Sequence, residues 1–372
     1  MIKFTCPYCY GEHTALDCSM TCSYNVPGTT VTCKTNVVKD ANGFIPQKDK
    51  ARCLKCQEAR KRIYCDVVKK EIPTGFTDSR GLPIALIGAK ASGKSNYIAV
   101  LIHEIRKRMT ARFNCTLDIS CSEESKRYYD DYYYNPLFND GEVVQATATA
   151  EQIPPLIFPL RFMDQKNRIK NVANLTFYDT AGENLDSDSD IEIYNRYIPN
   201  AKGIILLLDP LQVPSVRNQL QGKMALPAVN TNVAEVLSHV INNIRAVKNV
   251  KGTIRIPIAL AFTKMDALEQ FGLLPEGCCL LEESEHLRRG VFVQSDFDNT
   301  NQQMNDILEN FLDAEVLQML KQFEKYSLFG LSALGGVPNG SKLSGGEIKP
   351  RRVLDPLLWL LAENKYIQIA KK

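Results

Sequence analysis

One stretch constrains the fold of this chain more than any other: residues 88–95 match the pattern G-x-x-x-x-G-K-[ST] at every position. An apolar run suited to a buried strand precedes it at residues 83–87, and apolar residues at helical spacing follow it over residues 96–108. Between a strand and a helix, the backbone N–H groups of such a loop can point at phosphate oxygens, at the positive end of the helix dipole. The stretch therefore predicts a phosphate-binding loop made by Gly88, Ala89, Lys90, Ala91, Ser92, Gly93, Lys94, Ser95 and the adjoining Asn96.

Two side chains of this loop have defined chemical roles in such a setting. We expect the Lys94 ammonium to reach the β- and γ-phosphates of a nucleotide. We expect the Ser95 hydroxyl to ligate Mg²⁺.

The composition is that of an ordinary globular protein, with 372 residues, 44% hydrophobic and 23% charged, enough for one large domain and a smaller one. The net charge of +3 gives no argument for an anionic membrane or for nucleic acid, and the basic run at residues 60–62 is a weak footprint. The start of the chain lacks a signal peptide pattern, and no apolar run approaches the roughly 18 residues of a membrane span. We therefore expect a cytoplasmic protein.

Cysteines concentrate near the start, where eight of the twelve lie between Cys6 and Cys65. Two C-x-x-C knuckles, at Cys6/Cys9 and Cys53/Cys56, can together complete a closed tetrahedral Zn²⁺ site, which is a structural arrangement. A second Zn²⁺ site is an open alternative, made by Cys18, Cys22, Cys33 and Cys65. We expect a zinc-binding module over residues 1–74, a linker over 75–81 and a second domain over 82–372.

A second motif follows the expected strand at residues 172–178, where the chain reads Asp179-Thr180-Ala181-Gly182-Glu183. An acidic residue at the end of a strand can hold Mg²⁺ through water, and a glycine N–H there can sense a γ-phosphate. We assign these roles to Asp179 and Gly182.

Two more motifs end later strands. Residues 256–262 lead into Thr263-Lys264-Met265-Asp266, and residues 326–331 lead into Ser332-Ala333-Leu334. The Asp266 carboxylate can accept hydrogen bonds from guanine N1–H and N2–H₂ while the Lys264 stem packs on the base. The backbone of Ser332, Ala333 and Leu334 can meet guanine O6. Strands alternating with helices predict an α/β fold with a mostly parallel sheet, helices on both faces and the ligand at the carboxyl edge.

In this order, the four motifs resemble those of Ras-like GTPases of the TRAFAC class, over about residues 82–368. With the cysteine knuckles and the ending at residues 355–361, the chain resembles more narrowly the bacterial double-GTPase group of predicted conflict systems, with an N-terminal zinc ribbon. The resemblance implies a P-loop NTPase fold that binds GTP/GDP. It implies Lys94 on the phosphates, Ser95 and Asp179 on Mg²⁺, Gly182 on the γ-phosphate and Asp266 on guanine.

Three positions depart from that family pattern. Thr263 replaces the usual Asn, which predicts weaker ties to the phosphate loop, and Glu183 replaces the Gln that orients attacking water, which predicts slow hydrolysis. Lys90 replaces a common Gly and either adds charge in cis or blocks a partner's arginine finger. The threonine that covers the nucleotide is Thr147 or Thr149, and the sequence leaves both open.

The leading hypothesis is a GTP-binding and GTP-hydrolysing switch, slow without a partner. One alternative is a nucleotide-binding scaffold whose zinc module recruits a partner, and another is a P-loop ATPase. The expected partners are a guanine nucleotide and a protein effector or conflict-system partner, a homo-oligomer is open, and neither nucleic acid nor a membrane is expected.

Overall fold

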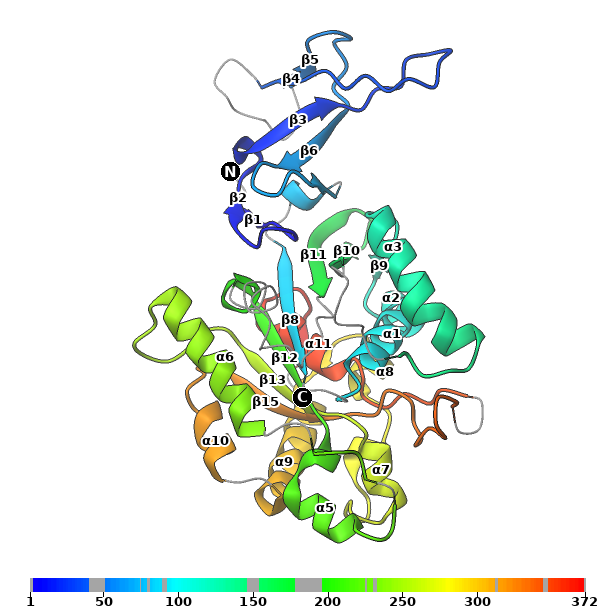
Figure 1. The fold of residues 1–372 in the computed structure, drawn as a ribbon, viewed down its shortest axis with the longest axis vertical. Helices are drawn as coiled ribbons and strands as arrows, with labels where there is room; N and C mark the ends of the chain where they lie inside the picture. The colour runs from blue at the N-terminus through cyan, green and yellow to red at the C-terminus, as the bar shows by residue number, and fades with distance from the viewer. Residues whose placement is uncertain are drawn as a thin grey trace.

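The computed structural model describes residues 3–39, 51–73, 75–78, 81–88, 92–145, 154–177, 196–224, 226–229, 233–311, 314–343 and 347–370. Its centre is a seven-stranded sheet with the order β15-β13-β12-β8-β11-β10-β9 (Figure 1). Only β10 runs against its neighbours in this sheet. The mostly parallel α/β sheet predicted from the sequence is thereby confirmed. The strands are β8 (Leu82–Gly88), β9 (Cys115–Leu117), β10 (Leu156–Met163), β11 (Ile169–Phe177), β12 (Gly203–Leu208), β13 (Ile258–Phe262) and β15 (Tyr326–Gly330).

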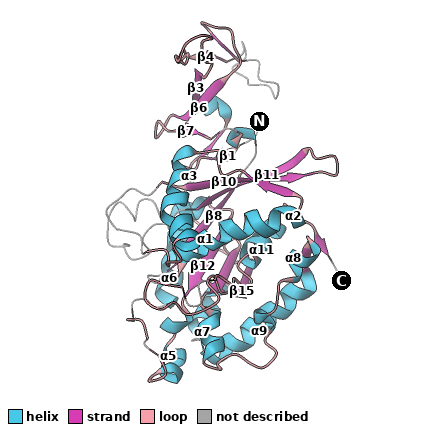
Figure 2. Cartoon of the chain, turned by 90° about the vertical axis from the view of Figure 1, so that its right-hand side faces the viewer, coloured by secondary structure: helices cyan, strands magenta, loops and turns pink. Residues whose placement is uncertain are grey.

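Helices cover both faces of the sheet, as alternation along its strands requires (Figures 1 and 2). In β8, Ile84 and Leu86 join one buried cluster, while Ala85 and Ile87 join the other. The first cluster packs against α1 (Lys94–Glu104) and α11 (Asp355–Glu363), and the second against α6 (Val233–Lys248) and α9 (Gln294–Phe311). The two faces therefore carry separate hydrophobic cores.

The other helices extend or connect these layers. Two π-helices continue α-helices: Ile105–Met109 follows α1, and Asp130–Asn139 follows α3. Among the described residues, no helix combines the length and the apolar character needed to cross a membrane. Further α-helices are α2 (Thr110–Arg112), α3 (Glu123–Tyr129), α5 (Pro214–Leu220), α7 (Met265–Gln270), α8 (Glu285–Arg289) and α10 (Ala314–Leu320), and residues 196–200 are helical. The short strand β14 (Phe292–Val293) pairs with β16 (Ile369–Ala370).

The cysteine-rich region builds three small sheets beyond one end of the large sheet (Figure 1). Its inner core includes Phe76, which is 2% exposed, and Ile157 of β10. Residues 76–78 of the expected linker form a 3-10 helix. The cysteine-rich region therefore packs directly on the large sheet. Its strands are β1 (Phe4–Thr5), β2 (Glu12–His13), β3 (Cys18–Cys22), β4 (Val37–Val38), β5 (Arg52–Cys53), β6 (Lys61–Cys65) and β7 (Glu71–Ile72).

Candidate nucleotide and metal sites

The expected phosphate loop joins the end of β8 to the start of α1. Gly93 has a φ of +81°, a conformation that a side chain would strain, and Lys94 begins the helix at 8% exposure. A Cβ on Gly88 would lie 2.4 Å from the Ser92 hydroxyl oxygen, so the backbone of Gly88 closes on Ser92 only because it has no side chain. Ala89, Lys90 and Ala91 lie outside the described residues.

Thr263 connects two of the predicted loops. Its hydroxyl is within 2.8 Å of the Ser92 carbonyl oxygen and 3.1 Å of the Leu208 carbonyl oxygen, and the residue is 3% exposed. A hydroxyl proton shared between two carbonyls is a common buried arrangement. Threonine thus keeps a direct tie to the phosphate loop, where the sequence predicted a weaker one.

Lys264 makes a contact that the sequence analysis missed. Its ammonium lies 2.6 Å from a carboxylate oxygen of Asp209, whose side chain is fully buried. The second Asp209 oxygen accepts the Leu211 N–H at 2.9 Å. Asp209 directly follows the apolar strand β12, and an acidic residue in that position is the signal that would have pointed to it.

Asp266 and the Ser332 loop lie side by side. The Met265 N–H donates to the Leu331 carbonyl at 3.2 Å, and the Leu331 N–H donates to the Phe262 carbonyl at 2.8 Å. The Asp266 carboxylate is half-buried.

Ser332, Ala333 and Leu334, which were expected to meet guanine O6, are held in place by local contacts. The Ser332 hydroxyl oxygen accepts the Gly335 N–H at 3.0 Å, and Ser332 is 1% exposed. Ala333 and Leu334 are partly buried against the core on the α1 face. The backbone that was expected to meet guanine O6 is therefore held in a defined position.

The Asn96 side chain is hydrogen-bonded to the backbone of a distant segment of the chain. Its side-chain oxygen accepts the Val144 N–H at 3.0 Å, and the adjoining Val143 N–H donates to the Ser341 carbonyl at 2.7 Å. Asn96 therefore anchors the segment that leads toward Thr147 and Thr149. Those two threonines lie outside the described residues, as do Asp179, Gly182 and Glu183.

The cysteines form two clusters in place of the single site predicted from the two knuckles. The proximal cluster consists of Cys6, Cys9, His13 and Cys65, and the distal cluster consists of Cys22, Cys33, Cys53 and Cys56. Within each cluster the ligand atoms lie within 4.8 Å of one another. The prediction that Cys6, Cys9, Cys53 and Cys56 share one ion was wrong, and so was the alternative set that included Cys18.

The register of β3 and β6 explains this partition. Cys18 faces Cys65, and Cys22 faces Lys61, so the two ends of this antiparallel strand pair are four residues apart. At about 3.4 Å per residue, that separation is roughly 14 Å, which one metal ion cannot span. Cys18 shares a buried cluster with Cys65, but its thiol donates to the Thr14 carbonyl at 3.6 Å, and burial raises the pKa of that thiol to about 12.

Both donor sets suit Zn²⁺. In the distal cluster, the Cys22 and Cys56 sulfurs are 3.4 Å apart and the Cys33 and Cys53 sulfurs 3.7 Å. Zn–S bonds of about 2.3 Å in a tetrahedron would separate two sulfurs by about 3.8 Å. The distal sulfurs are therefore already close to that spacing.

Backbone N–H groups support thiolate charge in both clusters. The Tyr8 N–H points at the Cys6 sulfur at 3.4 Å, and the Lys55 N–H points at the Cys53 sulfur at 3.3 Å. Backbone hydrogen bonds lower the pKa of Cys53. Hydrogen bonds from Cys6 and then His13 lower the pKa of Cys9. Thiolates are the form that binds metal.

His286, Asp296 and Asp355 form a third group of possible metal ligands, and the Arg352 side chain binds two of them. The Arg352 guanidinium donates to Asp296 at 3.1 Å and to Asp355 at 2.9 Å. The group therefore forms a buried ion-pair network that joins α8, α9 and α11.

Among curated proteins, the chain is similar to an ESX-1 scaffolding and assembly protein of Mycolicibacterium smegmatis, SaeC, whose own name marks that role as provisional. The two are 25% identical over 319 residues, which is 80% of this chain and 78% of the relative. No family model matches the chain.

Several solved structures are similar to this chain in fold. The GTPase-like domain of S. cerevisiae Ski7, bound to GTP, gives a TM-score of 0.34 at 14% identity and covers 77% of this chain. This chain spans 50% of that one. The SRb-GTP/SRX complex of Chaetomium thermophilum gives a TM-score of 0.31 at 14% identity, over 70% of this chain and 94% of that chain.

Proposed function

We propose that the chain binds a guanine nucleotide at the carboxyl edge of its large sheet and hydrolyses GTP slowly. The observation that carries the proposal is the hydrogen bond between Thr263 and Ser92. It joins the loop that holds the expected base-reading Asp266 to the expected phosphate loop. Parallel α/β sheets bind ligands at this edge. A base-reading loop in contact with a phosphate loop suits a nucleotide better than it suits phosphate alone.

In this proposal, each side chain has one task. Lys94 neutralises the β- and γ-phosphates, and Asp266 accepts the hydrogen bonds of the guanine edge. A bound Mg²⁺, held by Ser95 and Asp179, would neutralise charge that develops on the phosphates. Glu183 orients the attacking water, but its charge repels the γ-phosphate, and hydrolysis is therefore slow.

Three further tasks belong to residues beyond the described part of the chain. Gly182 would offer its N–H to the γ-phosphate, and Thr147 or Thr149 would close over the nucleotide. Lys90 would add a positive charge in cis or block a partner's arginine finger. These assignments come from the resemblance to Ras-like GTPases of the TRAFAC class.

The proposal includes one structural Zn²⁺ in the proximal cluster and one in the distal cluster. Closed sets of four Cys and His ligands leave no position for a substrate, so these ions would stabilise the fold. The proposed domain order agrees with the narrower resemblance to the bacterial double-GTPase group. It consists of a cysteine-rich module over residues 1–74, a linker over 75–81 and a GTPase domain over 82–372. A protein effector would then be the partner of the switch.

A second candidate is a scaffold that holds nucleotide with little or no hydrolysis. The observation that favours it is the similarity to a relative named for scaffolding and assembly, which covers 80% of this chain. Phosphate release in a single turnover separates the two candidates. Release from the wild type that does not exceed release from Lys94→Ala would favour the scaffold.

The proposed base specificity has its own test. A fluorescent GDP analogue is bound to the full chain and displaced with unlabelled GTP or ATP. We expect displacement by GTP alone. Equal displacement by ATP would refute the guanine assignment and favour a P-loop ATPase.

A further inference from the structure

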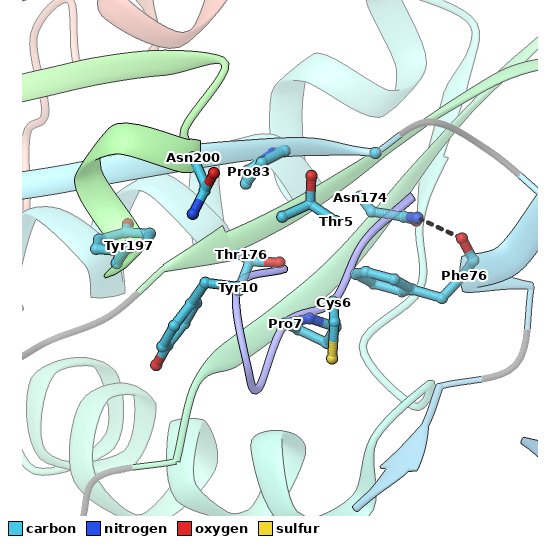
Figure 3. A pocket seen from close by; sticks show the side chains of 11 residues that line it. Thr5, Cys6, Pro7, Tyr10, Phe76, Pro83, Asn174, Thr176, Tyr197 and Asn200 are labelled. Carbon is cyan, nitrogen blue, oxygen red and sulfur yellow. Dashed lines mark hydrogen bonds between the residues drawn. The ribbon is translucent and has the colours of Figure 1, made fainter. Parts of the chain in front are cut away.

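One contact between the proximal cluster and the large domain is a pair of aromatic rings. Tyr10 directly follows Cys9, and its ring centroid lies 5.9 Å from that of Tyr197. Both tyrosines line a small pocket between the cysteine-rich region and the sheet (Figure 3). A nearby ion pair, between Glu12 of β2 and Lys202, spans the same boundary at 3.6 Å.

Tyr197 is hydrogen-bonded to β8, the strand that leads into the phosphate loop. Its hydroxyl accepts the Leu86 N–H at 3.1 Å and donates to the Ile84 carbonyl. These groups precede Gly88 by two and four positions on β8. Tyr197 is 4% exposed, so its ring has little room to move unless its neighbours move. A displacement of Tyr197 would therefore disturb the base of the phosphate loop.

The position of Tyr10 depends on the closed knuckle of the proximal cluster. Its φ is +62°, a left-handed conformation that is unfavourable for a residue other than glycine. The Tyr10 N–H donates to the Cys6 carbonyl at 3.1 Å, and the Cys6 N–H donates to the Gly11 carbonyl at 3.0 Å. A Cβ on Gly11 would lie 3.2 Å from His13 Nε2, so the ligands enclose this turn tightly.

The distal cluster supplies a natural control for this arrangement. Gln57 occupies the place of Tyr10, with a φ of +60° and an N–H that donates to the Cys53 carbonyl at 3.1 Å. Gln57 is exposed, and the core around the distal cluster contains residues of the cysteine-rich region alone, among the described residues. Lys69 takes the same place after Cys65, with a φ of +55° and an N–H that donates to the Cys65 carbonyl at 2.8 Å, and Lys69 is exposed as well. The same turn thus follows Cys6, Cys53 and Cys65, and the copy after Cys6 is the one that places an aromatic ring against the large domain.

We propose that metal binding at the proximal cluster and nucleotide binding at the phosphate loop are thermodynamically linked through Tyr10 and Tyr197, whereas the distal cluster is not linked. The linkage rests on the proposed function, because it requires a nucleotide at this site. A metal that holds the knuckle closed keeps Tyr10 against Tyr197 and thereby keeps β8 in its binding conformation. Linkage is reciprocal, so nucleotide would also tighten the proximal metal.

The first experiment compares one ligand substitution in each cluster of the full chain, purified with ZnCl₂. Zinc per chain is measured by mass spectrometry, and the Kd of a fluorescent GDP analogue is measured by titration. We expect Cys9→Ser to weaken the analogue at least fivefold, within the range of about 5–150-fold usual for coupled sites. Cys56→Ser should lose one zinc and bind the analogue like the wild type. Equal effects of the two substitutions, or no effect of Cys9→Ser, would overturn the linkage.

The second experiment keeps both metals in place. Tyr10→Ala should weaken the analogue at least fivefold with unchanged zinc content, while Gln57→Ala should change neither quantity. Combined with Cys9→Ser, Tyr10→Ala should add no further loss, because both changes break one connection. Additive losses would refute the role of Tyr10. If the wild type binds no GDP analogue, the proposed function itself is refuted. If the wild type binds the analogue and the losses in the two variants are additive, only the linkage is refuted.

Discussion

The Thr263 hydroxyl lies 2.8 Å from the carbonyl oxygen of Ser92 and so ties the loop of residues 263–266 to the phosphate loop. We expect Thr263→Val, which keeps the shape and removes the hydroxyl, to weaken a GDP analogue by about fivefold. A hydrogen bond of this type contributes about 1 kcal/mol. Thr300→Val is the matched control, because it removes another buried hydroxyl on α9. Equal losses of affinity in both variants would contradict the special role of Thr263.

Asp266 should decide which base is bound. Asp266→Asn replaces an acceptor of two guanine hydrogen bonds with an amide that can donate one to the O2 of xanthine. We expect GDP affinity to fall by at least tenfold and xanthosine diphosphate to become the better ligand, as measured by calorimetric titration with each nucleotide. Unchanged GDP binding would show that the base is read elsewhere.

The ion pair between Lys264 and Asp209 should stabilise the fold as well as the site. Asp209→Asn removes the buried charge, and we expect the free energy of unfolding to fall by about 1–3 kcal/mol. The measurement is urea unfolding followed by the fluorescence of Trp359, the one tryptophan of the chain. Glu324→Gln is the control, since the side chains of Glu324 and its partner Arg255 are 55% and 92% exposed and such pairs contribute little. A loss no larger than in that control would mean that the buried pair is not stabilising.

The Ser92 hydroxyl should be the group that excludes a side chain at position 88. Gly88→Ala places a Cβ 2.4 Å from that oxygen, and we expect at least a tenfold loss of nucleotide affinity in a direct titration. Adding Ser92→Ala removes the atom in conflict and should restore most of the binding. Ser92→Ala alone should cost little stability, because no described residue bonds its buried hydroxyl. Failure of the second substitution to rescue would place the conflict elsewhere.

The two cysteines that face each other in the antiparallel pair of β3 and β6 should behave differently. Cys65→Ser should lower the zinc content from two ions per chain to one, because Cys65 belongs to the proximal cluster. Cys18→Ser should retain two ions, because Cys18 belongs to neither cluster. Metal content of each purified variant checks the assignment. Loss of an ion in Cys18→Ser would reverse it.

Local patterns in the sequence were sufficient to predict the framework of the large domain. The buried runs at residues 203–209 and 256–262 formed β12 (Gly203–Leu208) and β13 (Ile258–Phe262), and the helix expected after the phosphate loop formed α1. These elements depend on residues that are near neighbours along the chain. These elements can therefore be predicted from the sequence without a structure.

Only the tertiary structure decided which distant groups meet. The partition of the cysteines followed from the register of β3 and β6, and the contact of Lys264 with Asp209 followed from the alignment of β12 and β13. Spacing along the chain carries no record of such register. The same holds for Thr263 and Ser92: the sequence by itself predicted a phosphate loop and a base-reading loop, and the packing of parallel strands brought those two residues within hydrogen-bonding distance.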